Sequence, residues 1–342
     1  MYEPAWKNAL EKLGNNVYIF NPYKYFKTGL IGRAQRKYGF GYSISKIRSE
    51  LILLTNKLKP DLILIYQGHF IDAVTISKLK KITWVTGYHN DNPFISVFSN
   101  PYMSINERVS LFCRYRHLLG SLPYYNSYHV YRESNIDDAK KQGVKHVACL
   151  KAYYIPELDH PINKTDPNLG ADIIFAGHPE PDGRENIIEK IIDSGINIKL
   201  YGDGIFWRKL LKKEKRKKIN SIKILNPVDY RIALNSSKIC LCFFSKRNND
   251  TYTRRVFEIT AMRKFLLAER TDTMLSLYKE GIEAEYFSSY DELKDKIKFY
   301  LKNEQARIKI EKTGYKRCIN AGYDVESRMK QWIKDVKKWQ IK

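Results

Sequence analysis

The residue types best suited to chemistry gather in residues 248–274, which read NNDTYTRRVFEITAMRKFLLAERTDTM. Arg254 and Arg255 open a segment that is predicted to be a helix, and an apolar run at 265–268 follows as a short strand. Cations are unfavourable in the first turn of a helix, but guanidinium groups and helix N–H groups together can bind an anion. We therefore predict that both arginines bind a phosphate or a diphosphate.

Glu258 lies one helical turn after the two arginines and on the same face of the predicted helix. A carboxylate at this place can accept hydrogen bonds from both hydroxyls of a ribose, as an acidic residue does in dinucleotide sites. The alternative is a plain Arg–Glu ion pair on the helix surface. Because Phe257 and Ile259 flank Glu258, we expect the helix to be half buried, which favours the ribose site.

Two further strand ends carry residues that could contact a ligand. Gly177 ends an apolar run, where it would let a ligand approach the backbone, and Arg184 begins the next helix. An anion bound at that helix start would offset the charge of Arg184, and the alternative is a solvent-exposed arginine that caps a loop. Gly202 and Asp203 follow the next run, with a tight turn as the alternative.

In the N-terminal half, His89 and Asp91 follow an apolar run directly, in the segment GYHNDNP at 87–93. Either side chain could orient a sugar hydroxyl or act as a general base. The alternative is a turn, because Asn-Asp-Asn-Pro is also a good turn sequence. The segment 67–69 ends the preceding strand and could line the same cleft.

The elements that must position these residues alternate between apolar runs and helical patterns, which is typical of parallel sheets covered by helices. Helices are predicted at the start of the chain and at 45–59, 71–81 and 184–195. Strands are predicted at 16–21, 60–68, 171–177, 238–244 and 264–270. Two further segments each begin as a strand, namely 82–93, which ends in a polar loop, and 196–204, which runs into a Gly-rich loop.

This alternation predicts the α/β class, with two Rossmann-like, doubly wound domains that face a cleft and bind ligands at the carboxyl ends of their strands. Three prolines in a stretch without periodicity mark the linker between the domains. We predict an N-terminal domain at 1–157, the linker at 158–169 and a C-terminal domain at 170–324. A final amphipathic helix at 325–342 can cross back to the N-terminal domain.

The composition bounds the partners of the chain. A net charge of +23 over 342 residues indicates an anionic partner, either phosphates, nucleic acid or a membrane surface, although the Lys, Ile, Asn and Tyr richness is also typical of A/T-rich genomes. The basic run at 208–218, together with Trp207, could rest on an anionic membrane, and a solvated face is the alternative. Five scattered cysteines, no metal-ligand spacing, no signal peptide and no membrane-spanning apolar run predict a cytosolic protein.

The order of these motifs resembles the glycosyltransferases of the group 1-like, spore-maturation-protein (CgeB-like) family over residues 171–330. The resemblance rests on Thr-x-Arg-x-Phe-Glu at 253–258, on the segment EAEYFSSYDEL at 283–293 and on a Tyr-Asp-x-x-x-Arg ending at 323–328. The N-terminal half is similar to the family through the strand at 60–68 and the Asp-x-Pro turn that begins at Asp91.

The resemblance implies the GT-B class, in which the C-terminal domain binds the nucleotide-sugar donor, the acceptor lies toward the N-terminal domain and a metal is usually absent. Glu258 matches the second acid of a Glu-x7-Glu motif, which binds the ribose, and Asp250 stands at the first. Thr253, Arg254 and Arg255 are then donor-binding residues. His89 lies where some relatives have a histidine near the sugar.

Two departures from the family put parts of this assignment in question. Residues 261–264 replace the usual Ala-x-Gly after the Glu helix, so close backbone approach to the donor is not assured there. The chain also begins within the first expected helix, so the first strand of the N-terminal sheet and its Gly-rich loop are either shortened or absent.

We therefore predict a metal-independent, cofactor-free glycosyltransferase of the hexosyltransferase type that moves a sugar from a nucleoside-diphosphate sugar to an acceptor hydroxyl. The expected setting is bacterial surface-glycan biosynthesis, such as lipopolysaccharide or capsule, with a glycan or lipid-linked acceptor. The protein is expected in the cytoplasm, with peripheral contact at the inner face of the membrane. A glycosyltransferase acting on nucleic acid and a non-catalytic GT-B scaffold stay open as alternatives.

Overall fold

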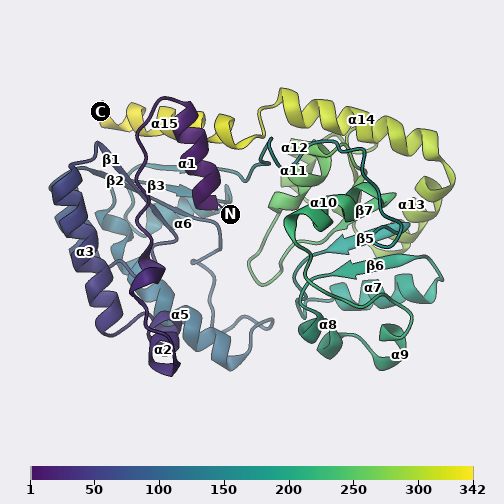
Figure 1. The fold of residues 1–342 in the computed structure, drawn as a ribbon, viewed down its shortest axis with the longest axis horizontal. Coiled ribbons are helices and arrows are strands. Elements are labelled where there is room, and N and C mark those ends of the chain that lie inside the picture. The colour runs from purple at the N-terminus through teal and green to yellow at the C-terminus, as the bar shows by residue number, and fades with distance from the viewer. Residues whose placement is uncertain (1, 342) are drawn as a thin grey trace. The chain divides into compact units, whose positions relative to one another are not determined.

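The computed structural model describes residues 2–341 and divides the chain into two compact units. The N-terminal unit contains the residues up to Lys151 together with those from Arg328 onward, and the C-terminal unit contains Ala152–Ser327. Each unit is an α/β sandwich of helices around a parallel sheet (Figure 1). None of the helices within residues 2–341 has the length and apolar character needed to cross a bilayer.

The N-terminal unit is built on a four-stranded, all-parallel sheet. Its strands follow one another across the sheet in sequence order, so the described part of this sheet has no point at which the strand order reverses. The strands are β1 (Leu62–Tyr66), β2 (Trp84–His89), β3 (Ser127–Val130) and β4 (Val147–Cys149).

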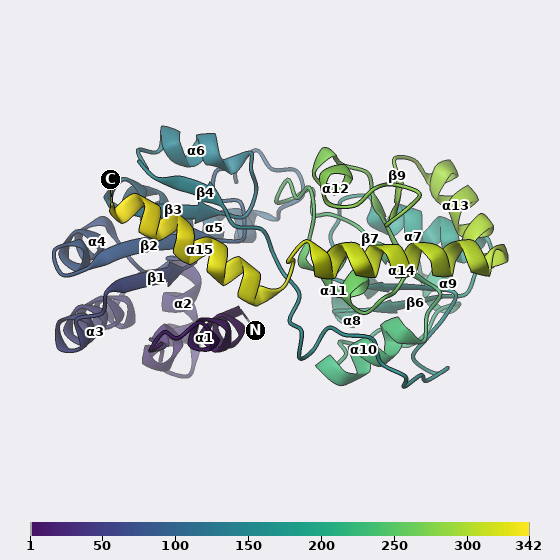
Figure 2. The same ribbon diagram turned by 90° about the horizontal axis from the view of Figure 1, so that it is seen from above.

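Helices cover this sheet and carry its connections. The last helix returns to the unit from Arg328 onward and lies across the strands (Figure 2), where Gln331 donates to the Cys149 carbonyl at 3.1 Å. The helices are α1 (Tyr2–Lys12), α2 (Leu30–Tyr38), α3 (Tyr42–Leu58), α4 (Ala73–Lys80), α5 (Ile105–Ser121), α6 (Asn135–Lys141) and α15 (Val325–Gln340), with 3-10 turns η1 (Pro22–Tyr25) and η2 (Leu122–Tyr124).

The strand predicted at 16–21 is wrong, because these residues form an irregular segment. Phe20 packs against the core of the unit, but Tyr18 and Ile19 stay 69% and 49% exposed. A strand needs a hydrogen-bonded neighbour, and this segment pairs with none of the strands in residues 2–341. No strand precedes β1 in that range, so the first strand and Gly-rich loop that the family resemblance implies do not occur there.

The C-terminal unit has a five-stranded parallel sheet with the order β6-β5-β7-β8-β9. The chain moves outward from β5 to β6 and then crosses to the other side of β5 to form β7. The order therefore reverses between β5 and β7, and ligands bind at such switch points, outside the carboxyl ends of the strands. The strands are β5 (Ile173–Ala176), β6 (Ile198–Tyr201), β7 (Ile239–Cys242), β8 (Leu266–Glu269) and β9 (Glu285–Phe287).

Helices cover both faces of this second sheet, with α7 and α14 on opposite sides in Figure 1. The core between the layers consists of aromatic and branched side chains such as Phe175, Trp207 and Leu267, all of which are buried. The helices are α7 (Arg184–Asp193), α8 (Gly204–Leu210), α9 (Lys213–Arg216), α10 (Pro227–Asn235), α11 (Arg254–Ala261), α12 (Asp272–Leu277), α13 (Tyr290–Lys302) and α14 (Glu304–Asn320).

The basic run at 208–218 is not one continuous helix, because it breaks between α8 and α9. Trp207 and Leu211 are buried in the core of the C-terminal unit, at 0% and 3% exposure. The apolar side chains that were expected to rest on a membrane therefore hold this segment to the unit's own interior. The proposed membrane contact of this run is corrected to a solvated basic face.

Candidate active site

Arg255 lies at the switch point of the C-terminal sheet. It stands in the first turn of α11, and its guanidinium carbon would come within 3.3 Å of a Cβ atom placed on Gly177, the residue that follows β5. Thr253 is the N-cap of α11 but makes no side-chain capping hydrogen bond. Arg255 is half-buried and makes no hydrogen bond or ion pair with any residue from 2 to 341. A cation and an uncapped helix N-terminus thus converge beside Gly177, as an anion site requires.

The residue at position 177 must be glycine for space to remain beside Arg255. A Cβ atom there would lie 2.7 Å from the ring of Phe175, which is buried in the core. Glycine therefore keeps the end of β5 open in front of Arg255.

Arg254 points the other way, into the interior of the C-terminal unit, where it is 8% exposed. Its Nε lies 2.9 Å from a Glu258 oxygen, its Nη2 lies 3.4 Å from Asp159, and its guanidinium carbon lies 5.4 Å from the centre of the Tyr153 ring. This corrects the prediction that both arginines bind phosphate, because Arg254 pairs with two buried carboxylates. Of the two adjacent arginines, only Arg255 is directed at Gly177.

Glu258 forms the ion pair with Arg254 that the sequence left as an alternative, but the pair is buried rather than on the surface. Its second oxygen accepts a hydrogen bond of 3.0 Å from the Tyr230 hydroxyl. Burial, and then the Glu258 carboxylate, raises the pKa of Tyr230 well above its ordinary value, so this phenol stays protonated and donates. Neither Tyr230 nor Asp159 was identified from sequence, and no local pattern marks either of them.

Asp159 is a buried acid whose titration affects stability. Its carboxylate accepts from the Ile155 N–H at 2.8 Å, and burial, followed by the Glu258 charge, raises the pKa of Asp159 from 3.8 to about 6. Between these pH values Asp159 binds more protons in the folded state than in the unfolded state, so the contribution of Asp159 to stability falls as pH rises from 3.8 to about 6 and is then constant. A shift of this size corresponds to about 3 kcal/mol at most.

We expect Asp159→Asn to remove this contribution, because asparagine still accepts from Ile155 but does not ionise. The change in the free energy of unfolding from pH 5 to pH 7.5, measured with urea, should be more positive in the variant than in the parent, since the other titrating groups are the same in both. Asp295→Asn, at an exposed position of α13, is the matched control and should keep the parental slope. Equal slopes in all three proteins would contradict the assignment.

Arg184 begins α7 and is 5% exposed. Its Nε and Nη2 donate to the two oxygens of Asp182 at 2.8 and 2.5 Å, and further donors reach the carbonyls of His178 and Phe244. The anion that the helix start was expected to require is therefore Asp182, two residues earlier. This corrects the prediction that Arg184 binds the donor phosphate, and assigns it instead to holding the loop after β5 against the loop after β7.

Gly202 and Asp203 follow β6, and both have structural explanations. Gly202 has a φ of +148°, and a Cβ atom there would meet the Gly177 carbonyl at 2.3 Å, so only glycine fits. Asp203 is the N-cap of α8 and accepts from the N–H groups of Ile205 and Phe206 at 2.9 and 3.1 Å. Both residues therefore fit the alternative of a tight turn. The lack of a side chain at Gly202 also allows the close approach of the Gly177 carbonyl.

Asp250 lies in the loop between β7 and α11, where its N–H donates to the Ser245 carbonyl at 2.9 Å. The half-buried Asp250 and Thr253 thus belong to the connection that carries Arg255 to the switch point. The structure brings Gly177, Gly202, Thr253 and Arg255 to one end of the sheet, and turns Arg184, Arg254 and Glu258 toward protein partners.

His89 ends β2 in the N-terminal unit and is 2% exposed. Its Nε2 lies 2.9 Å from Nε2 of His69, at the end of the neighbouring strand, and its Nδ1 accepts from the Asp91 N–H at 3.0 Å. Burial is the main cause that lowers the pKa of both imidazoles. Because both ring nitrogens of His89 are engaged, the geometry speaks against His89 as the general base. The ring holds the half-buried Asp91 in place instead.

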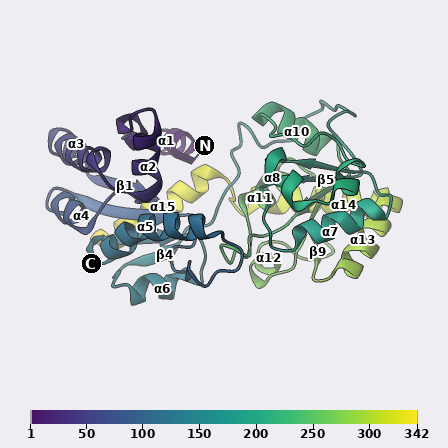
Figure 3. The same ribbon diagram turned by 90° about the horizontal axis from the view of Figure 1, so that it is seen from below.

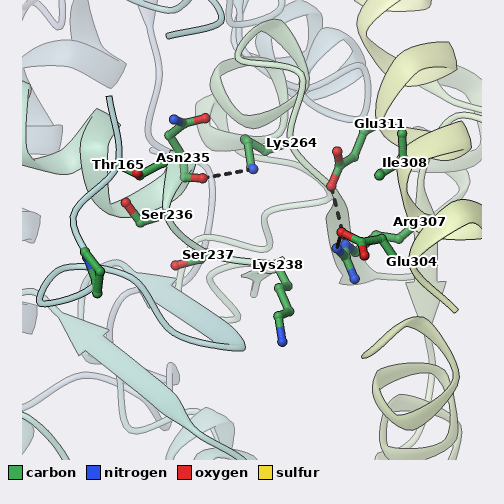
Figure 4. Close-up of a pocket in the computed structure, with 11 residues that line it drawn as sticks. Thr165, Asn235, Ser236, Ser237, Lys238, Lys264, Glu304, Arg307, Ile308 and Glu311 are labelled. Carbon is green, nitrogen blue, oxygen red and sulfur yellow. Dashed lines mark hydrogen bonds and ion pairs between the residues drawn. The ribbon is translucent and has the colours of Figure 1, made fainter. Parts of the chain in front are cut away.

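A separate cavity of about 380 Å³ lies at the other end of the C-terminal sheet (Figure 4). Lys238 and Lys264, which line it, directly precede β7 and β8, so the cavity faces the amino ends of the strands. Its charged groups already have partners, since Lys264 donates to the Asn235 carbonyl and Arg307 pairs with Glu304 and Glu311. Ligands of such sheets bind at the opposite end, so we do not assign this cavity to the site.

The fold of the whole chain is similar to that of solved glycosyltransferases. A glycosyltransferase from Rickettsia africae aligns with a TM-score of 0.65 and 12% identity, over 98% of this chain and 93% of that one. Sucrose-phosphate synthase from Thermosynechococcus elongatus aligns with a TM-score of 0.64 and 11% identity, over 86% and 78%. HepE of Anabaena, in complex with UDP and glucose, aligns with a TM-score of 0.60 and 12% identity, over 92% and 90%. The chain therefore has the GT-B fold.

The sequence itself matches one family model. Residues 184–334, which include α7 and α11, match a family described as glycosyl transferase-like. No curated protein matches the sequence. The family match and the GT-B fold together support a glycosyltransferase.

Proposed function

We propose that this chain transfers a sugar from a nucleoside-diphosphate sugar to an acceptor hydroxyl. The observation that carries the proposal is Arg255, a guanidinium with no hydrogen-bond or ion-pair partner among residues 2–341, which lies beside Gly177 at the start of α11. Transfer breaks the bond between the sugar carbon and the diphosphate, and negative charge builds on the leaving diphosphate. Donors fixed in advance at that place stabilise the charge without reorganisation.

The donor proposal includes a role for Glu258 and for UDP. Each carboxylate oxygen can accept a second hydrogen bond, so Glu258 can hold a ribose while it pairs with Arg254 and Tyr230. UDP is the first nucleotide to test, because the solved structures of HepE and of the pneumococcal O-GlcNAc transferase GtfA contain UDP. We propose that Arg255 replaces a metal, so that binding and transfer of a hexose need no divalent cation.

On the acceptor side we propose Asp91. We propose that the Asp91 carboxylate takes the proton of the acceptor hydroxyl, while the hydrogen bond from the Asp91 N–H to His89 fixes the loop. A glycan or lipid-linked acceptor of the bacterial surface, reached from the cytoplasm, fits the net charge of +23, because such acceptors lie at anionic membranes.

The decisive experiment is a thermal-shift panel of UDP, GDP, CDP, dTDP and their sugars in the presence of EDTA. We expect one nucleotide, with UDP the first candidate, to raise the melting temperature of the parent by mass action. Glu258→Gln should reduce this rise, since an amide accepts ribose hydroxyls less well than a carboxylate. A glycosyltransferase acting on nucleic acid would instead bind DNA with a steep dependence on salt. Absence of any nucleotide response would contradict the proposal and favour a non-catalytic scaffold.

A further inference from the structure

The N-terminal unit exposes an apolar and basic surface that the donor site does not explain. Helix α2 buries only Gly32, while its first two residues, Leu30 and Ile31, are 81% and 75% exposed. Isolated exposed leucines are ordinary, but a helix that begins with two adjacent, fully solvated aliphatic side chains has no apolar contact of its own at that end.

Gly32 fixes this arrangement. A Cβ atom on Gly32 would lie 1.8 Å from the Lys27 carbonyl oxygen, so the loop before α2 folds back tightly against the helix only because the residue is glycine. This loop places Lys27 at the same end of the helix as Leu30 and Ile31. The aliphatic pair and this lysine are therefore presented together.

Helix α5 extends the apolar area. It lies beside α2 (Figures 1 and 3), with Ser110 bonded to the Lys37 carbonyl at 3.1 Å and His117 to the Gly39 carbonyl at 2.8 Å. On α5 and the loop before it, Ile105 is 77% exposed, and Phe98 and Phe112 form an exposed aromatic pair with ring centres 5.2 Å apart. We call the exposed side chains of residues 23–42 and of these three positions the α2–α5 face.

The chain segment that contains α2 carries only positive charges. Every charged residue from Lys12 to Arg48 is lysine or arginine. Arg33 and Arg36 are exposed and form no ion pair or side-chain hydrogen bond within residues 2–341, and the Lys37 ammonium lies over the ring of its neighbour Tyr38. The basic groups are thus available to an anionic partner.

We propose that the α2–α5 face binds an anionic lipid bilayer. At a membrane interface, aliphatic and aromatic side chains enter the boundary of headgroups and acyl chains while Lys and Arg contact anionic headgroups, and this face offers both at once. Nucleic acid would use the basic groups but would leave Leu30, Ile31 and Ile105 in water. The inference does not depend on the proposed sugar transfer, because α2 and α5 contribute no residue to the donor site.

Co-sedimentation with vesicles tests the proposal. We expect the full chain to bind vesicles of phosphatidylcholine with about 30% phosphatidylglycerol, and to bind pure phosphatidylcholine far more weakly. Replacing Arg33, Arg36 and Lys37 by glutamine should weaken binding about 100-fold, on the basis of about 1 kcal/mol for each cation near the surface. Leu30→Ser with Ile31→Ser should weaken it about tenfold or more, because two apolar side chains no longer insert.

The matched control replaces three exposed lysines of the basic face at 208–218, namely Lys209, Lys213 and Lys217, by glutamine. It removes the same charge from the C-terminal unit and should leave vesicle binding within about twofold of the parent. Equal loss in the control would overturn the proposal in favour of diffuse attraction. Failure of the parent to bind anionic vesicles, or DNA binding that the serine variants retain, would also overturn it. A thermal melt of each variant without ligand, which requires no donor binding, verifies that the variant is folded.

Discussion

Arg255→Ala is expected to abolish most donor recognition while leaving the protein as stable as the parent. The side chain makes no hydrogen bond or ion pair within residues 2–341, so its removal breaks no structural contact, and the melting temperature should change little. A charge-assisted contact to a diphosphate should be lost, which weakens the nucleotide about 10- to 100-fold in calorimetric titration. Transfer itself should slow by about 100- to 1000-fold, because the guanidinium acts on charge that develops in the transition state.

Two variants make this result specific to Arg255. Arg255→Lys should recover part of the affinity, since lysine supplies the charge but not the two-pronged donor geometry. Arg263→Ala removes the same side chain from an exposed position just beyond the other end of α11 and should bind nucleotide like the parent. Unchanged nucleotide affinity in Arg255→Ala would remove the main support for the donor site at Gly177.

The contrast between Arg254 and Arg255 shows what could be predicted from the sequence alone. The sequence predicted two arginines and one glutamate at the start of a helix next to a buried strand, and the structure has α11 and β8 there. It could not tell which arginine points inward, because the partner that decides this, Asp159, lies 95 residues away along the chain. Contacts between distant residues depend on the packing of the elements, which no local pattern records.

The partner of Arg184 could have been predicted from the sequence. The argument that a cation at a helix start needs an anion was sound, and the anion is Asp182, whose two oxygens face the guanidinium. An Asp-x-Arg spacing at a loop end allows such a contact, so a protein partner could have been weighed against a ligand. For His89, by contrast, the decisive partner is His69 in the turn after β1, and its 2.9 Å contact depends on how that turn lies against the end of β2.

The fold was predictable where runs of apolar residues were long enough to be central strands. Strands β1, β2 and β5 to β8 lie within the runs expected for them, and the two parallel sheets of the α/β class are confirmed. The run at 16–21 has the same local pattern but forms no strand, because pairing depends on a neighbour rather than on composition. The three-residue strand β9 is too short for periodicity to identify it.

Arg254→Ala is expected to have the opposite effect to Arg255→Ala, with a large loss of stability. The substitution leaves Glu258 and Asp159 buried with no cation, and breaking a buried ion pair by removing one partner costs about 3–5 kcal/mol. The melting temperature should fall by roughly 10 °C or more in a thermal scan. The loss should be larger at pH 8 than at pH 5, because the Arg254 charge lowers the pKa of the buried Asp159, and without it the folded state holds that proton more tightly.

The control for this mechanism also removes the two carboxylates that Arg254→Ala leaves without a cation. Arg254→Met combined with Glu258→Gln and Asp159→Asn deletes all three charges, and should recover much of the stability that Arg254→Ala loses, because no buried charge is left unpaired. If Arg254→Ala melted like the parent but failed to bind nucleotide, the roles of the two arginines would have to be exchanged. The two adjacent arginines of α11 turn to different sides, because the buried acids Asp159 and Glu258 pair with Arg254 in the interior and leave Arg255 at the end of β5, where we propose that the donor binds.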